Sequence, residues 1–167
     1  MQCKKGGYIH RRHDRIRDLF SRLMDEVVHD VQTEPHLQPL NGEVLPPGSN
    51  LEDDARADFC GRGFWQQWEM AYFDVEVFSP FAKSYMKSNL ESLFERMENG
   101  KKTKYNSRII LVEHGSFTPV VMSSFGGFGK ETSPFVSKLV EKISEKQGSE
   151  TSSVSNYMRT KILFELI

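Results

Sequence analysis

Apolar residues in three parts of this chain recur at the three- and four-residue spacing of an amphipathic helix. The pattern predicts helices over residues 14–31, over residues 133–146, and from about residue 84 past residue 97. Asp14 is the expected N-cap of the first helix. Glu34-Pro35 follows it, and the residue before a proline avoids the helical region. Each predicted helix has one apolar face for a core and one polar face for solvent.

Other hydrophobic segments have the alternating pattern of strands. Residues 68–78 alternate most clearly, and Asp74 and Glu76 fall together on the face away from the apolar stripe of Phe73 and Val75. Three further segments predict strands: residues 55–60, 109–112 and 117–122. Since the last contains Pro119, it is expected at a sheet edge or a strand start.

The remaining segments connect these elements. Residues 34–54 are rich in proline and predict a long loop with one short strand near residues 36–38. Residues 156–167 predict a final helix or strand. The order of elements predicts an α/β fold with a mixed central sheet of about four strands flanked by helices.

Composition narrows the class of protein. The chain has 167 residues, of which 38% are hydrophobic and 27% charged, so we expect a soluble globular domain rather than a disordered chain. No apolar run reaches the roughly 18 residues of a transmembrane helix, and the N-terminus lacks the apolar stretch of a secretory signal. Cys3 and Cys60 cannot form a disulfide framework, which favours an intracellular location.

Charge is unevenly distributed along the chain. Residues 31–80 carry two arginines against nine acids, whereas residues 81–167 carry thirteen basic residues against nine acids. This pattern is compatible with a cation site beside a polyanion-binding surface, and the simpler alternative is a solvated surface with uneven charge.

Carboxylates are the main candidates for chemistry. If residues 55–60 and 68–78 pair as a hairpin, Asp58 and Asp74 approach each other, and clustered carboxylates need a cation or base between them. Hard oxygen ligands suit Mg²⁺ or Mn²⁺, which can activate a bound water. The alternative is that these acids are ordinary solvent-facing strand residues. Glu34, at the exit of the first helix, and Glu76 are further candidate ligands, and for Glu34 the alternative is a surface acid.

Basic residues beside the predicted elements are candidates for contacts with phosphate. Arg12 and His13 stand at the entry of the first helix, where an arginine can grip phosphate and a histidine can donate a proton. A run of lysines, Lys101, Lys102 and Lys104, precedes Tyr105 and can neutralise charge on a scissile phosphate. Helix capping and a solvated basic run are the simpler alternatives.

The order of these motifs resembles the restriction-like endonuclease of early-branching, site-specific non-LTR retrotransposons and related retroelement-derived animal proteins. The matching segments are Lys5–Gly7, Arg11–Leu19, His29–Glu43, Phe73–Phe78 and Glu113–Val121. The corresponding family motifs are, in the same order, K-G-G, R-H-N-x-x-R-D-L, H-D-V-x-x-E-P-x-L-Q-P-L-x-G-E, F-D-V-x-V-F and E-H-G-S-F-T-P-x-V. The resemblance covers residues 5 to about 146.

The resemblance implies a P-D…(D/E)-x-K nuclease core that nicks a DNA target site in a metal-dependent reaction. On this reading Asp58 and Asp74 are catalytic and bind Mg²⁺ or Mn²⁺, and Glu34 and Glu76 complete the metal site. Lys102 or Lys104 assists the attacking water or the charged phosphate. The implied nucleic-acid contacts are Arg12, His13, Lys101 and Tyr105. The implied partner is DNA, the implied compartment is the nucleus, and no membrane is involved.

The family pattern also implies a domain layout. Residues 1–10 correspond to the end of a linker from an upstream zinc knuckle, residues 11–147 to the nuclease domain, and residues 148–167 to a C-terminal segment. The parent would be a longer polyprotein that includes a reverse transcriptase.

The chain departs from the family pattern at three positions. Asp14 replaces the asparagine of R-H-N, Ala57 the proline of P-D, and Glu76 the usual core lysine. These departures favour an alternative, an inactive nuclease-fold remnant that at most binds nucleic acid. A third hypothesis, an unrelated α/β interaction module, applies only if the acids lie scattered in space.

Overall fold

The computed structural model of the chain describes residues 6–38 and 55–167. The expectations for residues 1–5 and for most of the predicted 34–54 loop therefore lie outside the described residues. The described elements, in chain order, are α1 (Gly6–Asp25), β1 (His29–Thr33), β2 (Phe59–Arg62), β3 (Met70–Phe78), α2 (Leu90–Arg108), the π-helical turn η1 (Ile109–Glu113), β4 (Ser116–Ser123), α3 (Thr132–Gln147) and α4 (Thr151–Leu166).

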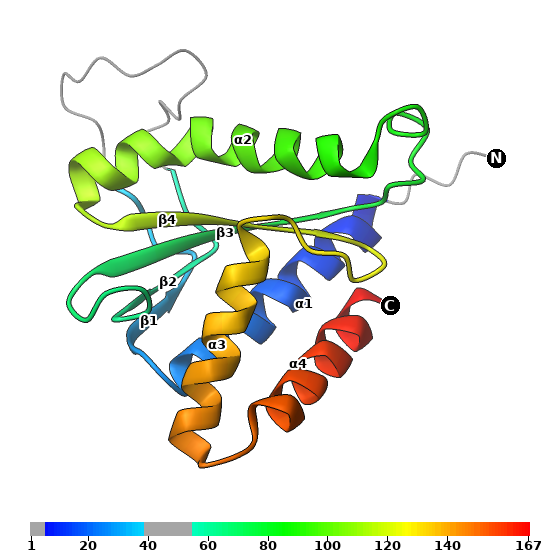
Figure 1. Cartoon of the computed structure of the whole chain (residues 1–167). Helices are drawn as coiled ribbons and strands as arrows, with labels where there is room; N and C mark the ends of the chain where they lie inside the picture. Colours follow the sequence, from blue (N-terminus) through cyan, green and yellow to red (C-terminus); the bar gives the residue numbers. More distant parts are fainter. Residues whose placement is uncertain (1–5, 39–54) are drawn as a thin grey trace.

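The strands form one mixed sheet in the order β1-β2-β3-β4. Strands β1 and β2 pair antiparallel, as do β2 and β3, whereas β3 and β4 run parallel. Helix α2 makes the crossover between the two parallel strands and covers one face of the sheet, while α1, α3 and α4 lie on the other face (Figure 1). The structure thus confirms an α/β fold with a four-stranded mixed sheet flanked by helices.

Two apolar clusters fill the two sides of the sheet. Phe73 and Val75 on β3 pack with α1, α3 and α4 in the larger cluster. Tyr72, from the opposite face of β3, packs with Tyr105 of α2 and Phe117 of β4. Asp74 points to the same side as Tyr72, so the face predicted to be polar is covered by α2 rather than open to water.

Most of the predicted elements are present, with shifted ends. The strand over residues 68–78, the edge strand over residues 117–122 and the helix over residues 133–146 are confirmed. The strand near residues 36–38 is reduced to a single β-bridge between His36 and Arg56, and the strand over residues 55–60 begins only at Phe59. The C-terminal segment is a helix, α4, which packs into the larger apolar cluster.

Three helix boundaries and one strand were wrongly predicted. The first helix begins at Gly6, so Asp14 lies inside it and is not its N-cap. It ends at Asp25, because the chain turns there and residues 29–33 enter the sheet as β1. Helix α2 begins at Leu90 instead of near Ser84, where the side chain of Asn89 accepts a hydrogen bond from Glu91 N at 2.9 Å. Residues 109–112 are not a strand but continue α2 as the turn η1.

None of the helices in the described part of the chain combines the length and the apolar character needed to cross a membrane.

Candidate functional site

Strand pairing brings Asp58 to the strand that carries Asp74. Asp58 directly precedes β2, whose first residue, Phe59, pairs with Phe73 of β3. The N–H of Asp58 donates to Phe73 O at 3.0 Å, so the pairing of the two strands extends to Asp58. The Asp58 carboxylate accepts a hydrogen bond from Val75 N at 2.6 Å. Because that N–H belongs to the peptide group that follows Asp74, the two acids flank the same short stretch of β3.

Asp74 is buried, with 4% of its surface exposed. Burial raises the pKa of its carboxyl to about 6, the adjacent Lys101 charge opposes the rise, and the negative charge of Asp58 adds to it. Lys101 Nζ lies 2.5 Å from Asp74 Oδ2. This ion pair, together with hydrogen bonding from Lys101 and Tyr105, favours the ionised form of Asp74.

Lys101 reaches the cluster from α2 and joins two acids. Its Nζ lies 3.1 Å from Glu76 Oε2, in addition to the contact with Asp74, and donates to Val75 O at 3.5 Å. Burial alone would lower the pKa of Lys101, but the charges of Asp74 and Glu76 outweigh it and hold the pKa above its ordinary value. Lys101 is therefore a fixed positive charge beside the acids of β3.

His13 reaches the cluster from α1. Its Nε2 lies 2.9 Å from Asp58 Oδ2, and its Nδ1 lies 3.2 Å from Asp14 Oδ1. The hydrogen bond to Asp58 raises the pKa of His13 to about 9, although partial burial acts in the opposite direction. The ring is thus protonated at neutral pH and donates through both nitrogens.

The five side chains form one cluster with an excess of negative charge. Asp58, Asp74 and Glu76 supply three carboxylates, and His13 and Lys101 supply two positive charges. The cluster draws on α1, the β2–β3 hairpin and α2, so the acids are gathered rather than scattered. For the described residues, no three His, Cys, Asp or Glu side chains already stand as a set of metal ligands. The three carboxylates supply hard oxygen atoms of the kind that divalent cations prefer as ligands, and each carboxylate is also paired with His13 or Lys101.

Glu34 lies next to this cluster but its carboxylate turns away from it. The backbone N–H of Glu34 donates to Asp58 O at 2.8 Å, which fixes the residue beside Asp58. Its carboxylate instead contacts Arg17 Nη1 at 2.5 Å. The structure therefore does not bring Glu34 to the carboxylates of β3.

Of the three candidate lysines, only Lys101 contacts the acids. Lys102 pairs with Glu131 at 2.6 Å, and Lys104 lies over the ring of Tyr105, 4.9 Å from its centroid. Tyr105 itself is buried against Phe117, and its hydroxyl favours the ionised form of Asp74. Tyr105 thus lies beside the acid cluster and not on an exposed surface.

Arg12 is separate from the acid cluster but adjoins it. It lines a cavity of about 300 Å³ whose wall includes Glu76, Ser79 and Ser124. Its Nε is buried and has no hydrogen-bond partner within the described part of the chain. Glu76 therefore borders both the acid cluster and this cavity.

The importance of Lys101 was detectable from helix spacing. The buried residues of α2 include Phe94, Glu98, Tyr105 and Arg108, which recur at three- and four-residue steps. Lys101 falls on this face and Lys102 and Lys104 do not. In contrast, no sequence signal shows that His13 binds Asp58 across 45 positions of the chain.

No family model matches the chain, and no curated protein matches it significantly.

Proposed function

We propose that this chain is a divalent-metal-dependent DNA endonuclease domain of retroelement origin, which nicks a target site by phosphodiester hydrolysis. The observation that carries the proposal is the cluster of Asp58, Asp74 and Glu76 on the β2–β3 hairpin, with Lys101 inserted from the crossover helix. A hairpin with acids and a lysine beside them supports the proposal of a restriction-endonuclease-like core, which the sequence resemblance implies. Action on chromosomal DNA would place the protein in the nucleus.

Each residue has a proposed role. Asp58 and Asp74 would hold Mg²⁺ or Mn²⁺. Glu76, which is more exposed than Asp74, would be a further ligand. When bound, the cation supplies a nucleophilic water and charge stabilisation. Lys101, fixed beside Asp74, neutralises negative charge that develops on the phosphoryl oxygens as the water oxygen bonds to phosphorus and the bridging P–O bond breaks. His13 orients Asp58 and adds a second positive charge.

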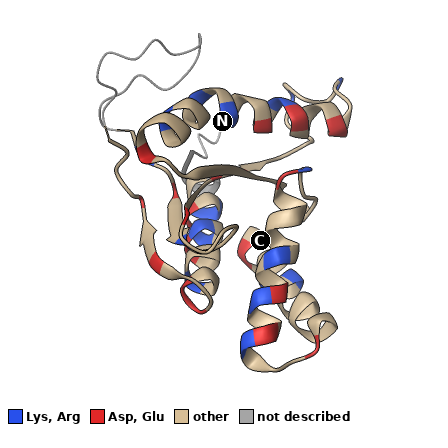
Figure 2. Ribbon diagram, turned by 60° about the vertical axis from the view of Figure 1, so that its left-hand side comes forward, with Lys and Arg blue, Asp and Glu red and all other residues tan. Residues whose placement is uncertain are grey.

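Contacts with the DNA backbone are proposed for Arg12 and for the lysines of α2. The N-terminal half of α2 carries mostly acids and its C-terminal half carries Lys101, Lys102, Lys104 and Arg108 (Figure 2). Lys104 is exposed. Arg108 is buried, Lys101 contacts the acids and Lys102 pairs with Glu131. Lys104 is therefore the lysine of this half that is open to a phosphate backbone.

The second candidate function is nucleic-acid binding without cleavage. The observation that favours it is that the positive charges of His13 and Lys101 already balance two of the three carboxylates. The cluster is therefore less repulsive without a bound cation. Such a remnant would keep the fold and the basic surface. Its affinity for DNA would fall steeply with salt, because phosphate contacts release counterions.

The test is nicking of supercoiled plasmid with Mg²⁺ or Mn²⁺, against an EDTA control. We expect metal-dependent nicking that falls at least about 100-fold in Asp74→Asn, because a cation ligand is lost. Lys101→Met should lose about 100-fold, and Lys102→Met and Lys104→Met should lose less than about threefold. The exposed Lys161→Met on α4 is the matched control.

The results separate the two candidates. Unchanged nicking by Asp74→Asn would reject the site assignment. A folded wild-type protein that binds DNA in a salt-dependent way but does not nick it would favour the inactive remnant.

A further inference from the structure

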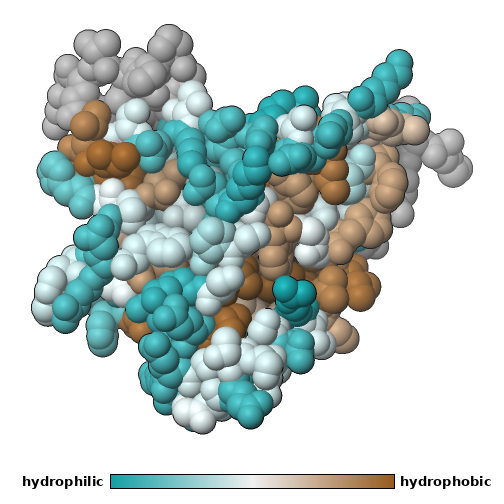
Figure 3. Space-filling view, viewed as in Figure 1, coloured by the Kyte–Doolittle hydropathy of each residue, from teal (hydrophilic) through white to brown (hydrophobic). Residues whose placement is uncertain are grey.

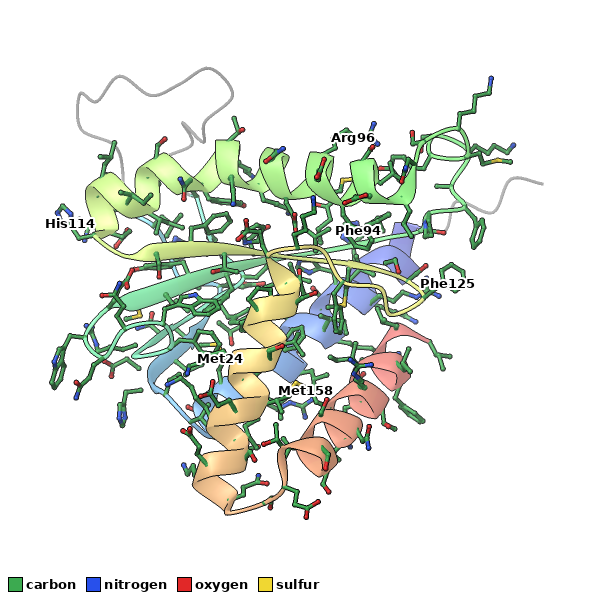
Figure 4. All side chains as sticks on the ribbon, viewed as in Figure 1. Met24, Phe94, Arg96, His114, Phe125 and Met158 are labelled. Atoms are coloured by element: carbon green, nitrogen blue, oxygen red, sulfur yellow. The ribbon has the colours of Figure 1, made fainter. Side chains whose placement is uncertain are left out.

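Two exposed phenylalanines pack against each other at one end of the sheet. Phe81 and Phe125 expose 75% and 64% of their surfaces, and their rings meet edge to face with centroids 5.2 Å apart. Phe81 lies in the segment after β3, and Phe125 in the connection between β4 and α3. Figure 4 labels Phe125 at the outer end of that connection, and Figure 3 shows hydrophobic surface at the same edge of the molecule. The two rings together form one exposed apolar surface, whereas Phe73 is completely buried.

The segments that carry these rings are basic. Residues 79–89 and 124–130 contain Lys83, Lys87 and Lys130 and no acidic residue. Lys130 pairs with Glu95 and Glu91 of α2. Lys83 and Lys87 are exposed, and no ion pair to either is seen among the described residues. Two positive charges thus flank the ring pair, which favours a polyanionic partner over an apolar protein surface.

The Arg12 cavity joins the ring pair to the acid cluster. Its wall contains Ser79 and Ser124, which lie close in sequence to Phe81 and Phe125, and Glu76, which pairs with Lys101. A backbone hydrogen bond from Ser124 N to Phe78 O at 2.8 Å holds the two segments together. The Nε of Arg12 is buried and has no hydrogen-bond partner among the described residues. A phosphate oxygen in the cavity would accept a hydrogen bond from it. The cavity therefore lies between Glu76 of the acid cluster and the segments that carry the two rings.

We propose that Phe81 and Phe125 form a stacking platform for an unpaired nucleotide of the substrate, whose phosphate occupies the Arg12 cavity. This inference rests on the proposed function and specifies its substrate as DNA with single-stranded nucleotides beside the scissile phosphate. Phenyl rings stack on any base, and arginine with lysines holds the backbone, which is the combination that single-strand binding surfaces use. The platform accepts a base without reading its identity.

The test measures binding in EDTA, where no cleavage occurs, by fluorescence anisotropy of a labelled 12-nucleotide single strand and of the matching duplex. The Phe81→Ala/Phe125→Ala variant should lose about tenfold or more in affinity for the single strand and less than about twofold for the duplex. Phe81→Leu/Phe125→Leu should lose nearly as much, because leucine keeps the apolar surface without the ring face. Trp68→Ala, a 78%-exposed aromatic on the β2–β3 turn, is the matched control and should bind as the wild type does.

Three outcomes overturn the proposal. Equal single-strand affinity of the wild type and the double alanine variant would remove the platform. Full affinity in the leucine variant would show that ring stacking is not involved. Self-association of the wild type in size-exclusion chromatography that is lost in the double variant, without single-strand binding, would make the surface a protein interface.

The experiment also separates this inference from the proposed function. Ring-dependent single-strand binding by a protein that never nicks plasmid would retain the platform and reject the endonuclease. Metal-dependent nicking, together with a single-strand affinity that is unchanged in the double alanine variant, would retain the endonuclease and reject the platform.

Discussion

The ionisation of His13 depends on a single carboxylate from another element. The hydrogen bond to Asp58 raises the pKa of His13 to about 9 against partial burial of the ring. A histidine whose pKa is higher in the folded than in the unfolded state stabilises the fold fully below its ordinary pKa of 6.5. This contribution is lost as the pH rises from 6.5 through about 9.

His13→Gln should therefore flatten the pH dependence of stability. Between pH 6.5 and 9.5 the wild type should lose about 1–2 kcal/mol more than the variant, an estimate reduced for solvent screening of a partly exposed ring. The pKa of Asp74 is raised in the folded state, so its effect is a loss of stability as the pH rises from 3.8 to about 6. This range lies below the pH window of the His13 measurement. Urea unfolding at fixed pH values measures the difference.

The control for this prediction is the exposed His29 of β1. His29→Gln should leave the wild-type pH dependence intact. Parallel curves for the wild type and His13→Gln across the same window would show that the His13–Asp58 pair does not form.

Single residues of the site differ in how far the sequence reveals them. The approach of Asp58 to β3 follows from strand alternation and hairpin pairing, which are local properties of the chain. The direction of the Glu34 carboxylate does not, because it is set by Arg17 on a separate helix, and Glu34 has a left-handed φ of 52°. The choice of Lys101 depends on where α2 lies over the sheet, which is a tertiary property.

The length of α2 is the main difference between the predicted and observed elements. A run of Ile109, Ile110, Leu111 and Val112 reads as a buried strand, because β-branched and apolar residues favour strands. In the structure, Ile109 is buried while Ile110 and Leu111 are about half exposed, as expected on a helical turn with one inner face. The turn ends at His114, in the left-handed conformation, whose N–H donates to Ile109 O.

Gly100 weakens the helix that carries Lys101. It lies inside α2, and a Cβ added to it would meet nothing within 4 Å. Gly100→Ala should therefore stabilise the protein by about 0.5–1 kcal/mol, because alanine loses less backbone entropy in a helix. The change in the midpoint of urea unfolding measures this effect.

Gly115, between η1 and β4, is the contrasting position for the same measurement. A Cβ there would lie 2.4 Å from Met70 O, a backbone atom of β3 that cannot move freely. Gly115→Ala should destabilise the protein, by about 1–3 kcal/mol. Equal effects of the two substitutions would show that α2 and β4 do not have the described geometry.

At the scale of the whole molecule, one aromatic cluster joins the elements that position the acids. The ring of Phe135 on α3 contacts Phe20 of α1, Phe59 of β2 and Phe73 of β3, with centroids 5.1, 6.2 and 4.8 Å away. Phe59 follows Asp58 and Phe73 precedes Asp74, so this packing supports both acids from the opposite face of the sheet. The sequence predicts the layers of this fold from periodicity, but not which rings meet, because that depends on how α3 crosses the sheet.

Phe135→Ala should destabilise the protein by about 3–5 kcal/mol, because it removes a completely buried ring and leaves a cavity in the core. Phe164→Ala on α4 removes the same atoms from a side chain that is 75% exposed, and should change stability by less than about 0.5 kcal/mol. Urea unfolding followed by both tryptophan fluorescence and circular dichroism measures each effect. A small loss for Phe135→Ala would mean that α3 does not pack on the sheet as described. A large loss confined to one probe would mean that the helical layer unfolds separately from the hairpin that carries Asp58 and Asp74.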